Sequence, residues 1–178
     1  MKKNHLWQRA ASFAARAHLH QLRLDGATPY FAHPARVAMT VLLTFGCRDE
    51  VAVAAALLHD TIEDTKTDYD DLLGEFGRAV ADCVAALTKN PTMPEAARER
   101  EYDARLARAD WRARLVKLAD QYDNYLDALA AGPARLRKSA AKCRRALVLA
   151  RPDAPTHPES RRAIAALGSL IAARRARA

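Results

Sequence analysis

Hydrophobic residues recur along most of this chain at intervals of three and four, the spacing that places side chains on one face of an α-helix. Residues 4–22 carry one such stripe, and a second helix is predicted between Pro34 and Gly46. Residues 51–58, VAVAAALL, are apolar on nearly every side. They predict a central buried helix, which Asp49 is placed to cap.

The second half of the chain predicts a capped helix followed by longer ones. Thr67 and Asp70 have the spacing of a capping box, with Asp in place of the usual Glu, so a helix is expected to begin there. Residues 90–100 contain two prolines and mixed charges, which predict a loop. Further helices are expected over about 101–130 and 134–150, and a basic helix after the loop at 151–159.

Composition supports an all-α fold in one domain. The chain has 178 residues, which suits a single hydrophobic core, and half of them are hydrophobic. Alanine, the strongest helix former, is abundant, whereas the chain has only six glycines and no β-branched runs.

Charge, cysteine content and the lack of a membrane or signal segment indicate which partners and which compartment to expect. The net charge of +8 and the isoelectric point of about 9.8 fit a polyanionic partner, or a basic surface that only keeps the protein in solution. Three widely spaced cysteines without a CxxC pair indicate small buried side chains in a reducing compartment. No apolar run is long enough to span a bilayer and no signal-peptide core is found, so a cytoplasmic protein without a membrane partner is expected.

The candidate chemistry begins where the buried helix ends, in LLHDTIEDT (residues 57–65). His59 and Asp60 follow the apolar run, and Glu63 and Asp64 lie four residues after them. Burying several carboxylates without compensation costs several kcal/mol each, and a divalent cation would remove that cost. An exposed acidic helix end is the alternative, but acidic side chains are unfavourable at a helix C-terminus.

Two further polar positions could complete a metal site. His33 lies between a turn and a helix that begins near a proline, and Asp120 lies in LVKLADQYDNYLDAL. Imidazole and carboxylate ligands together suit manganese, iron or zinc. Lys117 and Asp127 on the same helix are expected on a solvated face. Spacing alone does not bring together ligands that lie on separate helices.

The motif H…HD…D is the signature of the HD superfamily of metal-dependent phosphohydrolases, and residues 5–150 resemble its RelA/SpoT-type hydrolase domains. The segments that carry the resemblance, in family order, are QLRLDGATPYFAHP, AALLHDTIEDT, EFGRAVADCVAALTK and VKLADQYDN. The chain is most similar to the stand-alone small alarmone hydrolases, which include the metazoan SpoT homologue. An HD domain over residues 1–150 is therefore expected, with residues 151–178 as a loop and basic helix that pack on or extend it.

The resemblance implies a role for each residue that matches the family motif. The implied metal ligands, usually for Mn²⁺, are His33, His59, Asp60 and Asp120. Glu63 and Asp64 match the pair that orients and activates the hydrolytic water, and Arg23 and Asn124 match substrate-binding residues. The implied reaction removes pyrophosphate from the 3′ position of ppGpp or pppGpp and leaves GDP or GTP.

The sequence departs from the family pattern beside Arg23. Leu24 stands where relatives often have Lys, so one positive charge that would face phosphate is missing. Alternatives to the guanosine alarmones are therefore another nucleotide such as ppApp or NADPH, or a non-enzymatic basic module that binds RNA. A complete HDxxED set favours an enzyme that requires a nucleotide substrate and no nucleic acid. Monomer and homodimer both remain open.

Overall fold

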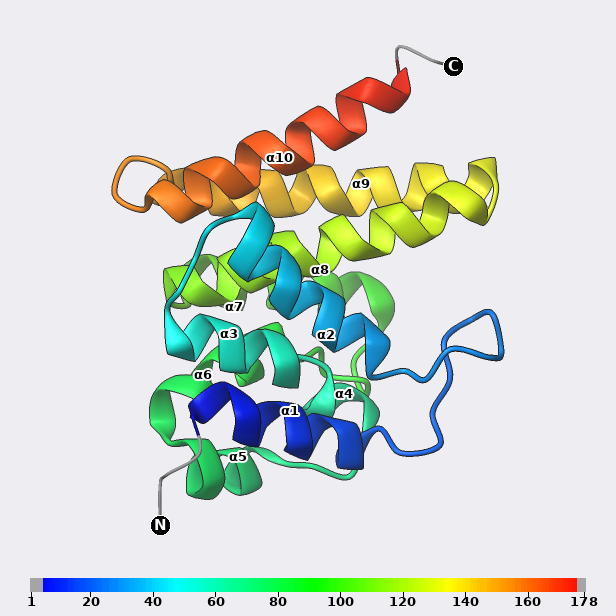
Figure 1. Ribbon diagram of the computed structural model, residues 1–178. Helices are drawn as coiled ribbons and strands as arrows, with labels where there is room; N and C mark the ends of the chain where they lie inside the picture. Colours follow the sequence, from blue (N-terminus) through cyan, green and yellow to red (C-terminus); the bar gives the residue numbers. More distant parts are fainter. Residues whose placement is uncertain (1–4, 176–178) are drawn as a thin grey trace.

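The computed structural model describes residues 5–175, and within that range the secondary structure is helical, without a β-strand (Figure 1). The all-α prediction is therefore confirmed. The α-helices are α1 (Leu6–Ala17), α2 (Ala32–Met39), α3 (Glu50–Leu58), α4 (Thr61–Asp64), α5 (Tyr69–Phe76), α6 (Arg78–Leu87), α7 (Glu95–Arg108), α8 (Trp111–Ala130), α9 (Pro133–Ala150) and α10 (Pro158–Arg175). A π-helical turn, Thr40–Thr44, follows α2, and a 3₁₀ turn, Arg151–Asp153, follows α9.

Helix α3 is the centre of the packing, as its all-round apolar sequence predicts. It contacts α1, α2, α6 and α8, and each of residues 52–58 is buried. Asp49 caps it as expected, because its side chain accepts a hydrogen bond of 2.9 Å from the Ala52 amide. Figure 1 shows α1 and α5 below α3, with α8, α9 and α10 stacked above it. The last residues of α3 are therefore held in place by helices on several sides.

The predicted helix over about 101–130 is wrong in one respect, because the chain forms two helices that meet at Ala109 and Asp110. Helix α7 begins at Glu95, inside the segment expected to be a loop. Arg114 Nη1 donates to the carbonyl oxygens of Leu106 and Ala109, which stabilises the end of α7. The Asp110 side chain accepts from the Arg112 amide at 2.9 Å and begins α8. Arg114 thus caps the C-terminus of α7 and Asp110 caps the N-terminus of α8, which explains why the helix is interrupted between them.

Two other helix boundaries also differ from the predictions. The first helix ends at Ala17 rather than residue 22, and His20 has a left-handed backbone with φ of 69°. The capping box lies one residue later than Thr67 and Asp70. Asp68 accepts from the Asp71 amide at 2.9 Å and Asp71 accepts from the Asp68 amide at 3.1 Å, because a carboxylate accepts more strongly than a hydroxyl.

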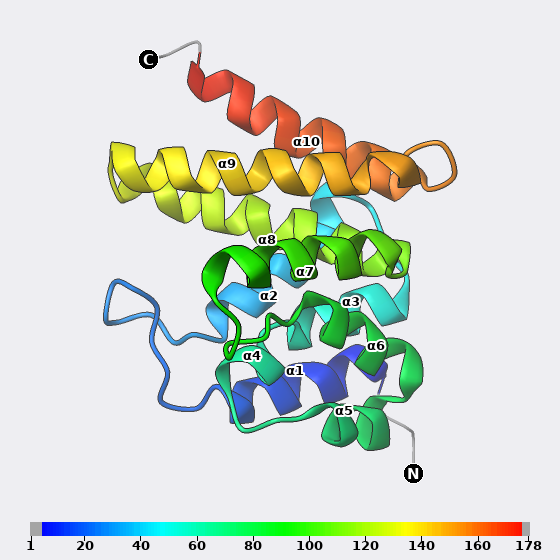
Figure 2. The ribbon, with the colours of Figure 1, turned by 180° about the vertical axis from the view of Figure 1, so that it is seen from behind.

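The C-terminal segment packs on the rest of the chain. Helix α10 contacts α8 and α9, and Ala163 and Leu167 are buried in the common core (Figure 2). Arg162 Nε also donates to the Phe45 carbonyl at 2.6 Å, next to Gly46 with its φ of 66°. We propose from these contacts that residues 151–175 extend the domain formed by residues up to 150. The end of the predicted basic helix, residues 176–178, lies outside the described residues.

Burial agrees with one further expectation. Cys47, Cys83 and Cys143 are buried and have free thiols. Over residues 5–175, none of the helices combines the length and the low polarity that crossing a bilayer would require.

Arg114 provides a test of how the α7–α8 break is stabilised. It forms a two-point ion pair with Asp153, with distances of 2.7 and 2.6 Å, and the two side chains are only 11% and 7% exposed. We expect Arg114→Met to lower the free energy of unfolding by about 3 kcal/mol or more, because Asp153 is left buried without its partner. Chemical denaturation with urea measures the change.

The matched control is Arg144→Met, since Arg144 is exposed and forms no ion pair with any residue between 5 and 175. This variant should unfold like the parent protein. If both variants lose less than about 1 kcal/mol, the Arg114–Asp153 pair does not stabilise the junction.

Candidate metal centre and active site

Three neighbouring helices bring the four predicted ligands together. His33 lies in α2, His59 and Asp60 lie between α3 and α4, and Asp120 lies in the middle of α8. His59 Nε2 is 3.2 Å from Asp60 Oδ2 and 3.9 Å from Asp120 Oδ1. His33 Nε2 is 3.6 Å from Asp60 Oδ2 and 3.4 Å from Asp120 Oδ1. Potential donor atoms of His33, His59 and Asp60 all lie within 4.8 Å of one another.

Both imidazole rings have their outer nitrogen engaged away from this cluster. His59 Nδ1 lies 2.8 Å from the Ala56 carbonyl oxygen, and His33 Nδ1 lies 2.6 Å from Asp123 Oδ2. Because each partner is an acceptor, each Nδ1 carries a proton, and when a ring is neutral its Nε2 presents a lone pair to the carboxylates. His59 Nε2 is buried and has no hydrogen-bond partner among the described residues. This arrangement fits a divalent cation bound between the rings and the acids.

The pKa values of His33 and Asp60 show how the charges of the cluster are balanced when no cation is bound. Burial by itself lowers the pKa of His33, but hydrogen bonds with Asp120 and Asp123 outweigh burial and raise it to about 9. Desolvation raises the pKa of Asp60, but the charge of His59 outweighs it and holds this pKa well below its ordinary value. A cation that binds between these groups must displace the extra proton, so binding releases protons and strengthens as the pH rises toward 9.

Asp120 is surrounded by donors from its own helix. Lys117 Nζ and Gln121 Nε2 donate to Asp120 Oδ2 at 2.8 and 2.9 Å, and Asn124 Nδ2 donates to Oδ1. The expectation that Lys117 lies on a solvated face is wrong. Its side chain is 20% exposed, and its ammonium nitrogen lies 5.3 Å from the ring centroid of Tyr102. The positive charge of Lys117 offsets one of the two carboxylates in the cluster.

Asp123 and Arg36 support His33 and were not identified from the sequence. Arg36 donates through Nε to Asp123 Oδ1 at 2.6 Å and through Nη2 to Oδ2 at 2.9 Å. This two-point pair fixes the carboxylate that orients the His33 ring. The available signal was spacing, since Asp123 follows Asp120 by three residues and Arg36 follows His33 by three.

Asp127 is exposed, as expected of a residue on a solvated face, and it is also engaged in ion pairs. Its carboxylate accepts from Arg23 Nη2 at 2.6 Å and from Arg36 Nη2 at 3.2 Å, although its side chain is 40% exposed. Asp127 therefore joins the predicted substrate-binding residue Arg23 to the group that supports His33.

The two proposed catalytic carboxylates lie in the short helix α4, directly after Asp60. Asp64 Oδ2 lies 2.9 Å from the Tyr30 hydroxyl, which also lies 2.7 Å from Asp60 Oδ2. Asp60 and Asp64 therefore share a face, as their spacing predicts. Glu63 Oε2 accepts from the Lys89 amide at 2.9 Å. Desolvation and the charge of Asp60 raise the pKa of Glu63 above its ordinary value, despite the amide hydrogen bond.

Tyr30 was missed in the sequence because a single tyrosine in a loop carries no spacing signal. Its ring stacks on His18, with centroids 4.7 Å apart, and His18 Nδ1 lies 2.8 Å from Gln21 Oε1. Gln21 Nε2 in turn donates to the Asp64 carbonyl at 2.7 Å. The end of α1 and the loop after it therefore position α4 from outside the cluster.

Basic residues surround the hollows beside this cluster. Arg23 Nη2 is 3.5 Å from Asn124 Oδ1, so the two predicted substrate-binding residues are neighbours. A cavity of about 450 Å³ is lined by Arg23 and Arg36, and one of about 580 Å³ is lined by Asn124. Helix α9 contributes positive side chains that were not singled out in the sequence: Arg135, Lys138 and Lys142. Their spacing of three and four is the signal that could have found them.

Known proteins are similar to this chain in both sequence and fold. Residues 10–146 match the family described as HD domain. The human protein named guanosine-3′,5′-bis(diphosphate) 3′-pyrophosphohydrolase MESH1 is 42% identical over 119 residues, which are 66% of each chain. The Xenopus tropicalis protein of the same name is 40% identical over 119 residues, again 66% of each. The match thus spans just under two thirds of the length of these relatives.

A longer bacterial relative and a solved structure extend the comparison. A protein from Aquifex aeolicus named guanosine-3′,5′-bis(diphosphate) 3′-pyrophosphohydrolase is 40% identical over 120 residues, which are 17% of its length. A solved structure described as a metazoan ortholog of SpoT that hydrolyzes ppGpp superposes with a TM-score of 0.78 and 25% identity. It covers 94% of this chain and 96% of the other. With a family match over most of its length and the His-Asp cluster in place, the chain belongs to the HD domain family.

Proposed function

We propose that this protein is a metal-dependent hydrolase that removes pyrophosphate from the 3′ position of ppGpp or pppGpp and leaves GDP or GTP. The observation that carries the proposal is the convergence of His33, His59, Asp60 and Asp120 beside the acids of α4. The names of the relatives with about 40% identity support the same substrate.

His33, His59, Asp60 and Asp120 would hold the metal ion, for which we propose Mn²⁺. The mixed nitrogen and oxygen donors suit this ion, although another divalent transition metal would also fit. When bound, the ion would polarise a phosphoryl oxygen and make a coordinated water more acidic. Asp123 and the Ala56 carbonyl keep both Nε2 atoms free for this role.

Glu63 and Asp64 would orient the attacking water and accept its proton. A raised pKa brings Glu63 closer to the working pH of a general base, and the Lys89 amide holds one of its oxygens. Tyr30 fixes the Asp64 carboxylate, which leaves the second oxygen of Asp64 for the water.

The phosphate groups of the substrate would lie along the basic hollows beside the metal centre. Arg23 and Asn124 are the proposed substrate contacts, and the positive side chains of α9 line the same region. Guanidinium and ammonium groups favour a polyanion there and stabilise charge that develops on the leaving group.

A second substrate class follows from Leu24. Its side chain is 74% exposed beside Arg23 and supplies no charge where relatives often have Lys. An adenosine alarmone such as ppApp, or NADPH, is therefore the alternative substrate, while a non-enzymatic RNA-binding role is disfavoured by the complete ligand set.

The first test is a panel of nucleotides with added Mn²⁺, scored for released pyrophosphate or phosphate. We expect ppGpp to release pyrophosphate, and we expect a chelator to abolish the release because the cluster loses its cation. Release that persists at full rate with the chelator would contradict the metal-dependent mechanism. Release from ppApp or NADPH but not from ppGpp would replace the proposed substrate with the alternative.

The second test concerns Glu63. Glu63→Gln should lower kcat by roughly 10² or more, the usual scale for losing a positioned acid–base group, and should retain the metal. The amide oxygen of Gln can still accept the Lys89 hydrogen bond, so the local fold is preserved. Glu95→Gln is the control, because Glu95 is exposed at the start of α7. Turnover like that of the control would remove Glu63 from the mechanism.

A further inference from the structure

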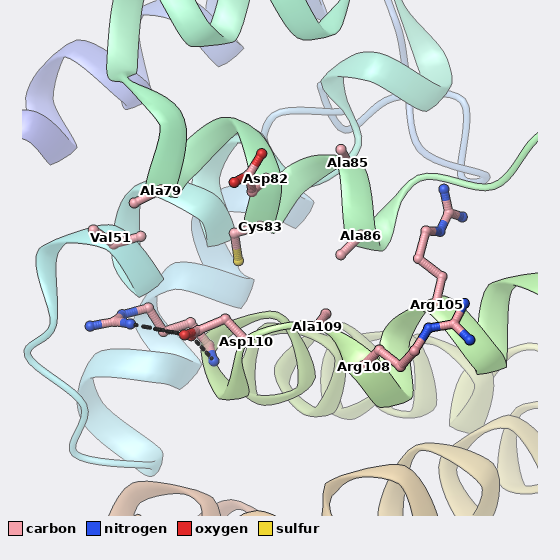
Figure 3. Close-up of a pocket in the computed structure, with 11 residues that line it drawn as sticks. Val51, Ala79, Asp82, Cys83, Ala85, Ala86, Arg105, Arg108, Ala109 and Asp110 are labelled. Atoms are coloured by element: carbon pink, nitrogen blue, oxygen red, sulfur yellow. Dashed lines mark hydrogen bonds and ion pairs between the residues drawn. The ribbon is translucent and has the colours of Figure 1, made fainter.

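A cavity of about 550 Å³ lies between α6 and the junction of α7 with α8, and no residue of the proposed active site lines it (Figure 3). One end carries Arg105 and Arg108 of α7. The other end carries Asp110 and Arg112, which form an ion pair at 3.2 Å. Its volume is within the range typical of small-ligand sites.

Positive charge is concentrated at the α7 end. Arg108 is exposed and forms no hydrogen bond or ion pair with any residue between 5 and 175. Arg105 has one acidic neighbour, Glu101 Oε2 at 3.4 Å, and its Nε is buried without a partner in the part of the chain that the structure describes. Two guanidinium groups therefore face one carboxylate, and several N–H donors remain for an anion.

The opposite end of the cavity carries no comparable excess of positive charge. Arg112 is shared between Asp49, at 2.7 Å, and Asp110, so this guanidinium is neutralised within the protein. The charge pattern therefore orients a ligand, with its anionic group beside Arg105 and Arg108.

The walls between the two ends are mostly small and apolar, and they include Ala79, Ala85, Ala86 and Ala109. One carboxylate, Asp82, also lines the cavity, and its Oδ1 accepts a hydrogen bond of 2.6 Å from the Tyr69 hydroxyl. In Figure 3 Ala85, Ala86 and Ala109 lie between Asp110 and the pair Arg105 and Arg108, while Ala79 lies beside Val51. Such walls present a smooth surface on which a flat apolar group packs at low cost in desolvation.

We propose that this cavity binds a phosphorylated small molecule of nucleotide size, with phosphate on Arg105 and Arg108 and the uncharged part against the alanine walls. Arginine pairs of this kind recognise phosphate through several parallel N–H donors. The nucleoside diphosphate that the proposed reaction releases belongs to this chemical class.

A short chain of hydrogen bonds connects this cavity to Glu63. Arg105 Nη2 donates to the Thr88 carbonyl at 2.5 Å, and the amide of the next residue, Lys89, donates to Glu63 Oε2 at 2.9 Å. Phosphate competes with the Thr88 carbonyl for the Arg105 donors. Occupation of the cavity therefore loosens the segment that holds Glu63 and lowers turnover. This second part rests on the proposed catalytic role of Glu63.

Binding is tested by calorimetry on the full, chelator-treated protein, with GDP, pyrophosphate and inorganic phosphate as separate probes. We expect saturable binding of GDP that is tighter than that of pyrophosphate, and at least a tenfold higher Kd for both in Arg108→Gln. Arg161→Gln is the control, since Arg161 is exposed on α10, does not line this cavity and has no ion pair within residues 5–175. It should bind like the parent.

Several results would overturn the site. They are the absence of saturable binding, or affinities that Arg108→Gln and Arg161→Gln leave equally unchanged. Equal affinities for GDP and pyrophosphate would overturn the role of the alanine walls. Thermal unfolding of each variant shows that the fold is intact, and these binding results stand even if the proposed hydrolysis fails.

Coupling to Glu63 is tested separately with initial hydrolysis rates. Added GDP should lower kcat in the parent and in Arg161→Gln, whereas kcat of Arg108→Gln should not respond to GDP. A rise in KM alone, equal in all three proteins, would instead be competition at the active site and would contradict the coupling.

Discussion

Two carboxylates, one buried and one half-buried, and two buried imidazoles share one small space, and this constraint governs the structure around them. Asp60 and Asp120 face the Nε2 atoms of His33 and His59, whose Nδ1 protons are already engaged elsewhere. Without a positive charge between the rings and the acids, the two Nε2 lone pairs would meet only carboxylate oxygens in a region of low polarity, which costs several kcal/mol. A proton on His33 or a divalent cation supplies this positive charge. Only the cation can also activate a water molecule or polarise a phosphoryl oxygen.

The fold holds this cluster by means of groups that never touch a substrate. Helix α3 is buried on all sides and ends at His59, so the ligand is fixed by core packing. Arg36 fixes Asp123, which in turn fixes His33. Stability and function are thus joined, because the helices that form the core also set the directions of the metal-binding atoms.

The net charge of +8 does not show where the basic side chains lie, and they fall into groups with different surroundings. Some arginines have structural roles, as Arg114 does at the α7–α8 junction. Arg135, Lys138 and Lys142, on α9, line the hollows beside the metal centre. Arg105 and Arg108 of α7 face a separate cavity. A basic composition therefore serves at least three purposes, and only the positions of the side chains separate them.

Much of the fold could be predicted because the signals are local. The all-round apolar run of α3 and its cap at Asp49 both depend on residues close in sequence. The break at Ala109 could not be predicted, since Arg114 stabilises it through contacts with the end of α7 and with Asp153. Helix propensity alone favours continuing through such a segment.

The candidate site shows the same division between local and distant signals. His59, Asp60, Glu63 and Asp64 lie in one motif, whereas the approach of Asp120 depends on how α8 packs against α3. The roles of Asp123 and Tyr30 arise from contacts across 90 and 30 residues of sequence. The spacing of Asp123 from Asp120 places both on one face of α8, but it does not report the contact with His33.

The central claim is that a divalent cation binds through both histidine rings. Pulsed electron paramagnetic resonance of the Mn²⁺-loaded protein tests it most directly, because it detects nitrogen nuclei bonded to the ion. Two imidazole nitrogens should couple to the ion in the parent protein, and one should remain in His33→Ala. Bound Mn²⁺ without any nitrogen coupling in the parent would contradict the assignment of His33 and His59 as ligands.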